Sequence, residues 1–486
     1  MKKKLLFLMA AIALFVPSVM AAELTAGTDA ELKNAFATAA DGDTIKLTAN
    51  IENHEGGSSD LMVKDGKTIT LDLNGFSIST NPAWNDATDK PVHRSITVNG
   101  GTLNIIGKGT IKHAKHVAVN VWGVENPTNT TYSALNVGKD VILEGDTGIS
   151  VFQDSYNAYG VEVTFEGTIN ATENGITING NIKHEQAPVI TVKGTAKVNA
   201  TGEGGCAIYA AGNGTWYFED GVEIKGVGSA LGIKAGEINI MGGTFTATGA
   251  SNENPVLYGN GIKPSGAAIQ IETYLSNYYG HVRLHIEGGE FISEQGNAIL
   301  EYGSNTTSAA EEIDIRSGVF TAAEEKEALK LSDSIKTNND VVNVLGGAFS
   351  SSISEEIVNE EAIRISFAAI IDKEVVDMTE VTGVIVVPVG TVFDQETIDE
   401  LKALVGSTEE GYKFEGYYSD SNLTKKMDFT KELTEDTTIY MNFVKVPGEE
   451  NPKTSDMNLA LILALLGVSS VGATLVSRKR ALRANK

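Results

Sequence analysis

The feature that most constrains the fold of this chain is a strand-and-turn unit that occurs four times between residues 238 and 349. Each copy alternates apolar with polar residues, turns at Gly-Gly or Ser-Gly and then reaches a Phe. Alternation places the apolar side chains on one face of an extended strand, and Gly permits a sharp corner because it adopts positive φ at little cost. The four Phe residues are Phe245, Phe291, Phe320 and Phe349, which lie 46, 29 and 29 positions apart. After each circuit the chain therefore reaches an equivalent strand and turn, which predicts a coil of strands.

A coil of this kind is stable only when its circuits stack. One circuit buries few apolar side chains, whereas stacked circuits hydrogen-bond to two neighbours and share a continuous apolar column. Similar units recur upstream, so we expect about ten turns up to residue 360. The 51 Gly and 10 Pro among 486 residues suit a long array of short strands and tight turns. The sequence therefore predicts an all-β solenoid.

The segment after residue 21 carries signals for a cap and for the first coils. Thr28-Asp29-Ala30-Glu31 is a capping box, which predicts a short helix that covers the open end of the solenoid. The segments GDTI at 42–45 and DLNG at 72–75 follow it. This order resembles the opening of right-handed parallel β-helix proteins of the pectin-lyase-like superfamily. The resemblance implies a right-handed parallel β-helix over residues 22–382 with an N-terminal helix cap.

Residues 1–21 have the three parts of a secretory signal peptide. Lysines occupy positions 2–4, an apolar run covers residues 5–16, and small residues stand at Val19 and Ala21. The apolar run is too short to span a bilayer. We therefore predict an exported protein whose first 21 residues are removed.

A change in composition after the coil marks a second unit over residues 383–446. It contains GYKFEGYYSD at 411–420, DF at 428–429 and DTTIYMNF at 436–443. These segments resemble the Listeria-Bacteroides repeat, a small β-grasp-like module of bacterial surface proteins. The resemblance implies that the module lies between the coil and the point of attachment to the cell.

The C-terminal segment contains a polar linker over 447–456, an apolar stretch over 457–477 and a basic tail over 478–486. The stretch is long enough to form a transmembrane helix, and the basic tail is expected in the cytoplasm. The linker contains Asn451, Pro452, Lys453, Thr454 and Ser455. This order resembles a Gram-positive sortase sorting signal.

The resemblance implies two partners. Sortase would cut after Thr454, and the Thr454 carbonyl would be joined covalently to peptidoglycan, so that the membrane anchor precedes attachment to the cell wall. A simple C-terminal membrane anchor is the alternative interpretation of the same segment.

Composition excludes several classes of function. Removal of residues 1–21 and of everything after Thr454 takes away net charges of +3 and +4, which changes the formal net charge from −25 to −32. Such an acidic surface repels nucleic acid.

The one cysteine, Cys206, rules out an intramolecular disulfide framework and is expected to be a small buried residue. The seven His residues show no metal-ligand spacing, so we expect no metal or cofactor, and a capped coil is expected to be a monomer.

A catalytic site on the coil is the less favoured interpretation. Polysaccharide lyases and hydrolases of the resembled superfamily need an Arg or Lys base or paired Asp residues. Residues 22–446 contain only four Arg and none of the expected catalytic motifs. Alignment of two coils gives the weak candidates Arg283, Asp314 and Arg316, by placing Arg283 beside Glu312, His285 beside Asp314 and Glu287 beside Arg316. We favour a cross-strand ladder of charges over a catalytic cleft.

Aromatic residues in the insertions between strands are candidates for sugar stacking. They are Trp84, Trp122, Tyr274, Tyr278 and Tyr279. The favoured hypothesis is a non-enzymatic surface protein, attached to the cell wall, that binds host or dietary glycans or surface proteins. The alternatives are a surface polysaccharide lyase or glycoside hydrolase, and a passive spacer.

Overall fold

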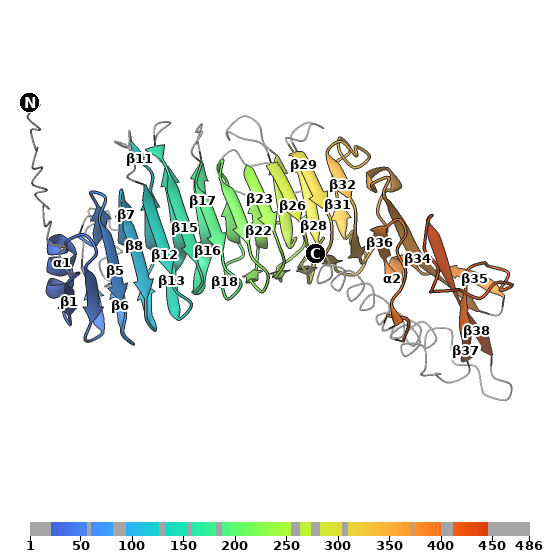
Figure 1. Cartoon of the computed structure of the whole chain (residues 1–486), viewed down its shortest axis with the longest axis horizontal. Coiled ribbons are helices and arrows are strands. Elements are labelled where there is room, and N and C mark those ends of the chain that lie inside the picture. The colour runs from blue at the N-terminus through green and yellow to red at the C-terminus, as the bar shows by residue number, and fades with distance from the viewer. Residues whose placement is uncertain are drawn as a thin grey trace, which may run out of the picture.

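The computed structural model describes residues 21–55, 60–80, 94–125, 132–153, 158–180, 187–253, 263–273, 282–303, 310–371, 373–395, 397–399 and 412–445. The regular secondary structure of these residues is nearly all strand, and the strands stand side by side along one elongated body (Figure 1). Residues 1–20, the sorting motif, the apolar stretch over 457–477 and the basic tail lie outside the described residues. No helix within the described ranges is long and apolar enough to cross a membrane.

Parallel strands form three ladders in the described part of the coil. The first ladder is a 12-stranded parallel sheet. Its strands are β1 (Glu23–Ala26), β2 (Thr44–Leu47), β5 (Thr68–Asp72), β8 (Thr102–Ile106), β12 (Ser133–Val137), β15 (Val161–Phe165), β17 (Val189–Val192), β20 (Thr215–Phe218), β23 (Gly236–Ile240), β26 (Val282–Ile286), β29 (Ala310–Ile315) and β32 (Val342–Val344).

The second ladder receives one strand from most circuits, directly after the strand of the first ladder. Its strands are β3 (Ile51–His54), β6 (Ser77–Thr80), β9 (Gly109–Lys112), β13 (Val141–Gln153), β16 (Thr168–Gly180), β18 (Lys197–Ala200), β21 (Glu223–Gly226), β24 (Thr244–Ala247), β27 (Glu290–Ser293), β30 (Val319–Thr321) and β33 (Gly347–Phe349).

The third ladder completes each circuit. It contains β4 (Met62–Lys64), β7 (Arg94–Asn99), β10 (Val117–Trp122), the second halves of β13 and β16, β19 (Cys206–Ala210), β22 (Ser229–Ile233), β25 (Ile269–Thr273), β28 (Ile299–Gly303) and β31 (Leu329–Lys330). A short antiparallel pair of β11 (Val124–Glu125) and β14 (Ala158–Tyr159) lies beside the ladders. This topology agrees with the expected coil of parallel strands.

The four repeated units are in register, as their sequence predicts. Ile238, Leu284, Ile313 and Val342 occupy one row of the first ladder. The second residue of each turn has positive φ, with values from +94° at Gly243 to +143° at Gly347. A side chain there would be strained, which explains why Gly stands at this corner in every copy.

Aromatic side chains stack along the interior of the coil. Ring centroids of Phe245, Phe291, Phe320 and Phe349 follow one another at 5.2, 4.9 and 4.8 Å. All four rings are almost fully buried. Because each ring lies on the equivalent ring of the next circuit, the side chains that form the core also fix the register of the strands.

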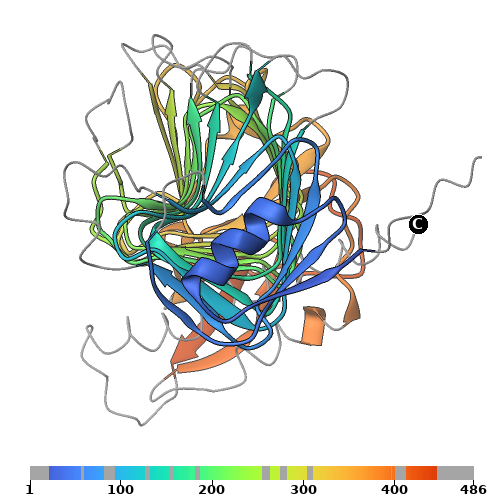
Figure 2. The same ribbon diagram turned by 90° about the vertical axis from the view of Figure 1, so that its left-hand side faces the viewer.

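A helix covers the N-terminal end of the coil. α1 (Asp29–Thr38) lies across this end in Figure 2 and buries Leu32, Ala35 and Phe36 against the first strands. The Thr28 hydroxyl accepts a hydrogen bond from the Glu31 amide, and the Glu31 carboxylate accepts one from the Gly27 amide at 2.8 Å. The predicted capping box and helix are therefore confirmed.

A second core closes the other end. The 3₁₀ turn η2 (Glu355–Ile357) still packs on the coil, since Ile357 belongs to its core. The elements after it are β34 (Ala362–Ile371), β35 (Glu374–Asp377), α2 (Thr379–Thr382), β36 (Val384–Pro388), β37 (Tyr412–Tyr418) and β38 (Thr437–Lys445). β36 pairs antiparallel with the last coil strand β33 on one side and with β34 on the other. Val384 and Val386 belong to the coil core, whereas Ile385 and Val387 belong to the second core. β36 therefore covers the end of the coil and is also the first strand of the module expected over residues 383–446.

The second core begins earlier than the sequence suggests. β34 pairs with β36 and β38, and its apolar residues Ile363, Ile365 and Phe367 pack in the second core. This strand lies inside the range 22–382 expected for the coil. Its alternation of apolar residues has the same period as that of a coil strand, so the pattern alone does not separate the two.

We predict that Phe320→Ala destabilises the protein strongly, because the cavity would interrupt the aromatic stack between two rings at 4.9 and 4.8 Å. The expected loss in free energy of unfolding is about 3 to 5 kcal/mol, measured by urea unfolding followed by circular dichroism. Tyr217→Ala is the control, since Tyr217 is 42% exposed, and should change stability by about 0.5 kcal/mol. Equal losses in the two variants would contradict the role of the stack.

Candidate functional site

A column of polar side chains follows the outer face of the first ladder. Asn239, His285, Asp314 and Asn343 are register partners on four successive strands, from β23 to β32. They face outward because they alternate with the buried row of Ile and Leu residues. The predicted pairing of His285 with Asp314 is confirmed.

Of the three weak catalytic candidates, Asp314 belongs to this column, and the two arginines beside it are paired with carboxylates. Arg283 aligns with Glu312 as predicted, but its guanidinium contacts Glu311 at 2.6 Å, next to a register shift at this point of the ladder. The Nε of Arg316 lies 2.7 Å from Asp314 and 3.5 Å from Glu287. Hydrogen bonding and charge from Asp314 raise the pKa of Arg316.

The column borders a shallow groove with a volume of about 300 Å³. Its walls include Asn239, Met241, His285, Glu287 and Arg316. The Asp314 side chain forms part of the wall and is only 5% exposed, whereas that of His285 is 25% exposed. Within the described residues, one ligand atom each from His285, Glu312 and Asp314 lies within 4.8 Å of the others. The groove therefore combines an imidazole and carboxylates with a guanidinium. The imidazole and the carboxylates can exchange protons or hold a cation.

A second polar cluster, which sequence reasoning missed, lies buried on the third ladder. The Nζ of Lys234 contacts the Glu272 carboxylate at 2.6 Å, and both side chains are fully buried. The Tyr302 hydroxyl donates to the other Glu272 oxygen at 2.7 Å and accepts from Gln270 Nε2 at 2.7 Å. Polar residues at alternate positions of the strand Ile269–Thr273, between two insertions, were the sequence signal for this cluster.

Gln270 attaches the insertion before β25 to the coil. Its side-chain oxygen accepts from the Ser265 amide at 2.9 Å, and its Nε2 donates to the Lys263 carbonyl at 2.6 Å. Together with the bond to Tyr302, these bonds give both the oxygen and the Nε2 of the buried Gln270 amide a hydrogen-bond partner. Cys206 lies nearby and is buried, as predicted, and burial raises the pKa of its thiol to about 12.

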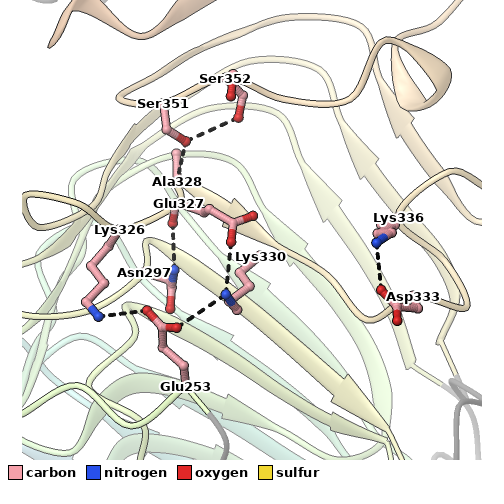
Figure 3. A network of polar contacts seen from close by, with 10 residues as sticks. All are labelled: Glu253, Asn297, Lys326, Glu327, Ala328, Lys330, Asp333, Lys336, Ser351 and Ser352. Carbon is pink, nitrogen blue, oxygen red and sulfur yellow. Dashed lines mark hydrogen bonds and ion pairs between the residues drawn. The ribbon is translucent and has the colours of Figure 1, made fainter. Parts of the chain in front are cut away.

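The other end of the same insertion is held by ion pairs (Figure 3). The Glu253 carboxylate contacts Lys326 at 2.8 Å and Lys330 at 3.3 Å, and Lys330 also contacts Glu327 at 2.9 Å. The hydrogen bond from Lys326 lowers the pKa of Glu253 despite partial burial. The side-chain Nδ2 of Asn297 donates a hydrogen bond to the main-chain carbonyl of Glu327, which ties the network to the neighbouring circuit. Both described ends of this insertion are therefore fixed to the coil.

The predicted sugar-stacking residues fall mostly outside the described residues. Trp84, Tyr274, Tyr278 and Tyr279 do so, and only Trp122 is placed. The Arg94 guanidinium lies 4.4 Å from the Trp122 ring centre, and Phe152 is a tilted neighbour at 6.4 Å. One face of Trp122 is thus occupied by its own protein, which leaves less of the ring for a ligand.

Comparison with known proteins identifies one part of the chain. Residues 381–441 match the family model of the Listeria-Bacteroides repeat domain. The module predicted over 383–446 is therefore confirmed as such a repeat. No curated protein and no solved structure gives a significant match to the chain.

We predict that Lys234→Met costs about 3 to 5 kcal/mol in free energy of unfolding, because it leaves the Glu272 carboxylate buried without its cation. The double variant Lys234→Met, Glu272→Met should recover part of this loss, since both buried charges are gone. The free energies of unfolding of the wild type, the single variant and the double variant are measured by urea unfolding.

The control is an exposed Lys–Glu pair of similar length on the same coil. Lys197 and Glu223 are 2.8 Å apart with side chains 52% and 59% exposed. Lys197→Met should cost less than about 1 kcal/mol. A loss as large as that of Lys234→Met would show that burial does not set the energy of these pairs.

Proposed function

We propose that the chain is a non-enzymatic bacterial surface protein, anchored to the cell wall, that presents a stiff coil for recognition of glycans or proteins. The observation that carries the proposal is the shared strand β36, which joins the coil to the repeat module through both cores. A module of this family is typical of bacterial surface proteins. A coil held rigidly on such a module is suited to display binding loops away from the cell.

The pairing of the arginines favours recognition over catalysis. All four Arg in residues 22–446 have described interactions: Arg94 with Trp122, Arg283 with Glu311, Arg316 with Asp314, and Arg364 with Asp436. A guanidinium that acts as a base must lose its proton, and a carboxylate partner opposes that loss. The net charge of −32 also disfavours capture of a polyanionic polysaccharide.

The proposal includes the finer assignments made from the sequence. The coil would be a right-handed parallel β-helix of the pectin-lyase-like superfamily, because parallel crossover connections are right-handed in nearly all proteins. The signal peptide would direct export. Sortase would cut after Thr454 and attach the protein to peptidoglycan, with the apolar stretch over 457–477 as the temporary membrane anchor.

The anchoring is tested by Thr454→Ala. Thr454→Ala keeps the main-chain carbonyl but removes the Thr side chain from the motif that sortase would recognise. The variant should therefore be lost from the covalent wall fraction and accumulate with the membrane. Immunoblots of wall digests and membranes from the native host measure the distribution. Ser455→Gly is the control, because Gly is the usual last residue of the resembled signal, and it should remain in the wall. A wild-type protein found only in the membrane would support the simple anchor instead.

The recognition role is tested by a glycan and polysaccharide screen of the purified protein with and without calcium. We expect binding without depolymerised product, because Arg283, Arg316 and Arg364 are each paired with a carboxylate. Among the described residues, the groove beside Asp314 favours the alternative, a polysaccharide lyase or glycoside hydrolase. Product that disappears in Asp314→Ala would establish that alternative, whereas product that survives this change would place an active site elsewhere.

A further inference from the structure

We propose that His285, Glu312 and Asp314 form a binding site for a divalent transition-metal ion such as Zn²⁺ on the outer face of the coil. Glu312 and Asp314 lie two residues apart on β29, and the register of β26 and β29 brings His285 of the neighbouring circuit beside them. The proposal is independent of wall anchoring and of the ligand bound by the insertions.

The ligand atoms are close enough for one ion to bind all three. One atom from each residue lies within 4.8 Å of the others, and the imidazole Nδ1 of His285 is 4.0 Å from a Glu312 oxygen. In a tetrahedral zinc site with bonds of 2.0 to 2.1 Å, ligand atoms lie about 3.3 Å apart. The Glu312 side chain is 48% exposed, so it can rotate toward the other two ligand atoms when an ion binds.

Asp314 is positioned as a metal-binding carboxylate usually is. It is almost buried, its Oδ1 accepts from Asn343 Nδ2 at 2.9 Å, and its Oδ2 accepts from Arg316 Nε at 2.7 Å. Each oxygen keeps a further lone pair. Outer hydrogen bonds of this kind orient a ligand and limit the freedom lost when the ion binds.

The local charge matches a divalent ion. Glu287, Glu312 and Asp314 carry three negative charges, and Arg316 carries one positive charge, which gives −2 around the groove. The outlying pair of Arg283 and Glu311 adds no net charge. The groove of about 300 Å³ leaves room for water to complete the coordination.

The donor set favours zinc over calcium. An imidazole nitrogen is a ligand for Zn²⁺ and other late transition metals, whereas Ca²⁺ takes six to eight oxygen ligands. Two carboxylates and one imidazole fall short of that number. A site with three protein ligands and an open position results.

The test is isothermal titration calorimetry of Zn²⁺ into the purified full-length protein, freed of metal beforehand. We expect one Zn²⁺ per chain. His285→Ala should weaken binding at least tenfold, and Glu312→Gln should do the same, because each removes a ligand. Glu311→Gln is the matched control, since it makes the same charge change one residue away, and it should bind within twofold of the wild type.

A spectroscopic measurement identifies the ligands. Co²⁺ bound in place of Zn²⁺ should give visible absorption bands that are lost in His285→Ala. The proposal fails if the wild type binds no Zn²⁺, or if His285→Ala binds as tightly as the wild type. It also fails if Glu311→Gln weakens binding as much as Glu312→Gln, since that result would show general attraction of cations to the acidic surface. Circular dichroism of each variant confirms that the fold is kept.

Discussion

The structure depends on the in-register stacking of parallel strands. Each circuit gains hydrogen bonds and apolar contacts only from its neighbours, so no circuit is stable alone. The Phe column makes this stacking specific, because a slip by one residue would turn every buried ring outward. The polar column that contains His285 and Asp314 is the outward consequence of the same register.

A stacked coil has two open ends, and the chain closes them differently. At the N-terminal end, α1 covers the apolar column without adding a strand. At the other end, β36 adds an antiparallel strand whose alternate residues enter two cores. Arg364 strengthens this joint, because it contacts Glu355 at the end of the coil and Asp436 before β38. The module is therefore structurally continuous with the coil, which suits a stiff display protein.

The sequence predicts the repeated part well because the residues that repeat are the residues that set the register. The Phe spacing and the Gly corners suffice to place His285 beside Asp314. The register does not predict the contacts of longer side chains, since Arg316 contacts Asp314, two residues before it in the chain, as well as the predicted Glu287. The Lys234–Glu272 pair was missed because it does not repeat, and β34 was placed in the coil because its alternation suits either core.

The most direct test of this account is amide hydrogen exchange, measured by mass spectrometry on the purified protein, across the joint between coil and module. If β36 belongs to both cores, its amides should exchange as slowly as those of β33 and β34, and all three should become exposed together as urea is added. If instead the module exchanges and unfolds while β33 stays protected, the two are separate bodies, and the claim of one continuous structure is contradicted.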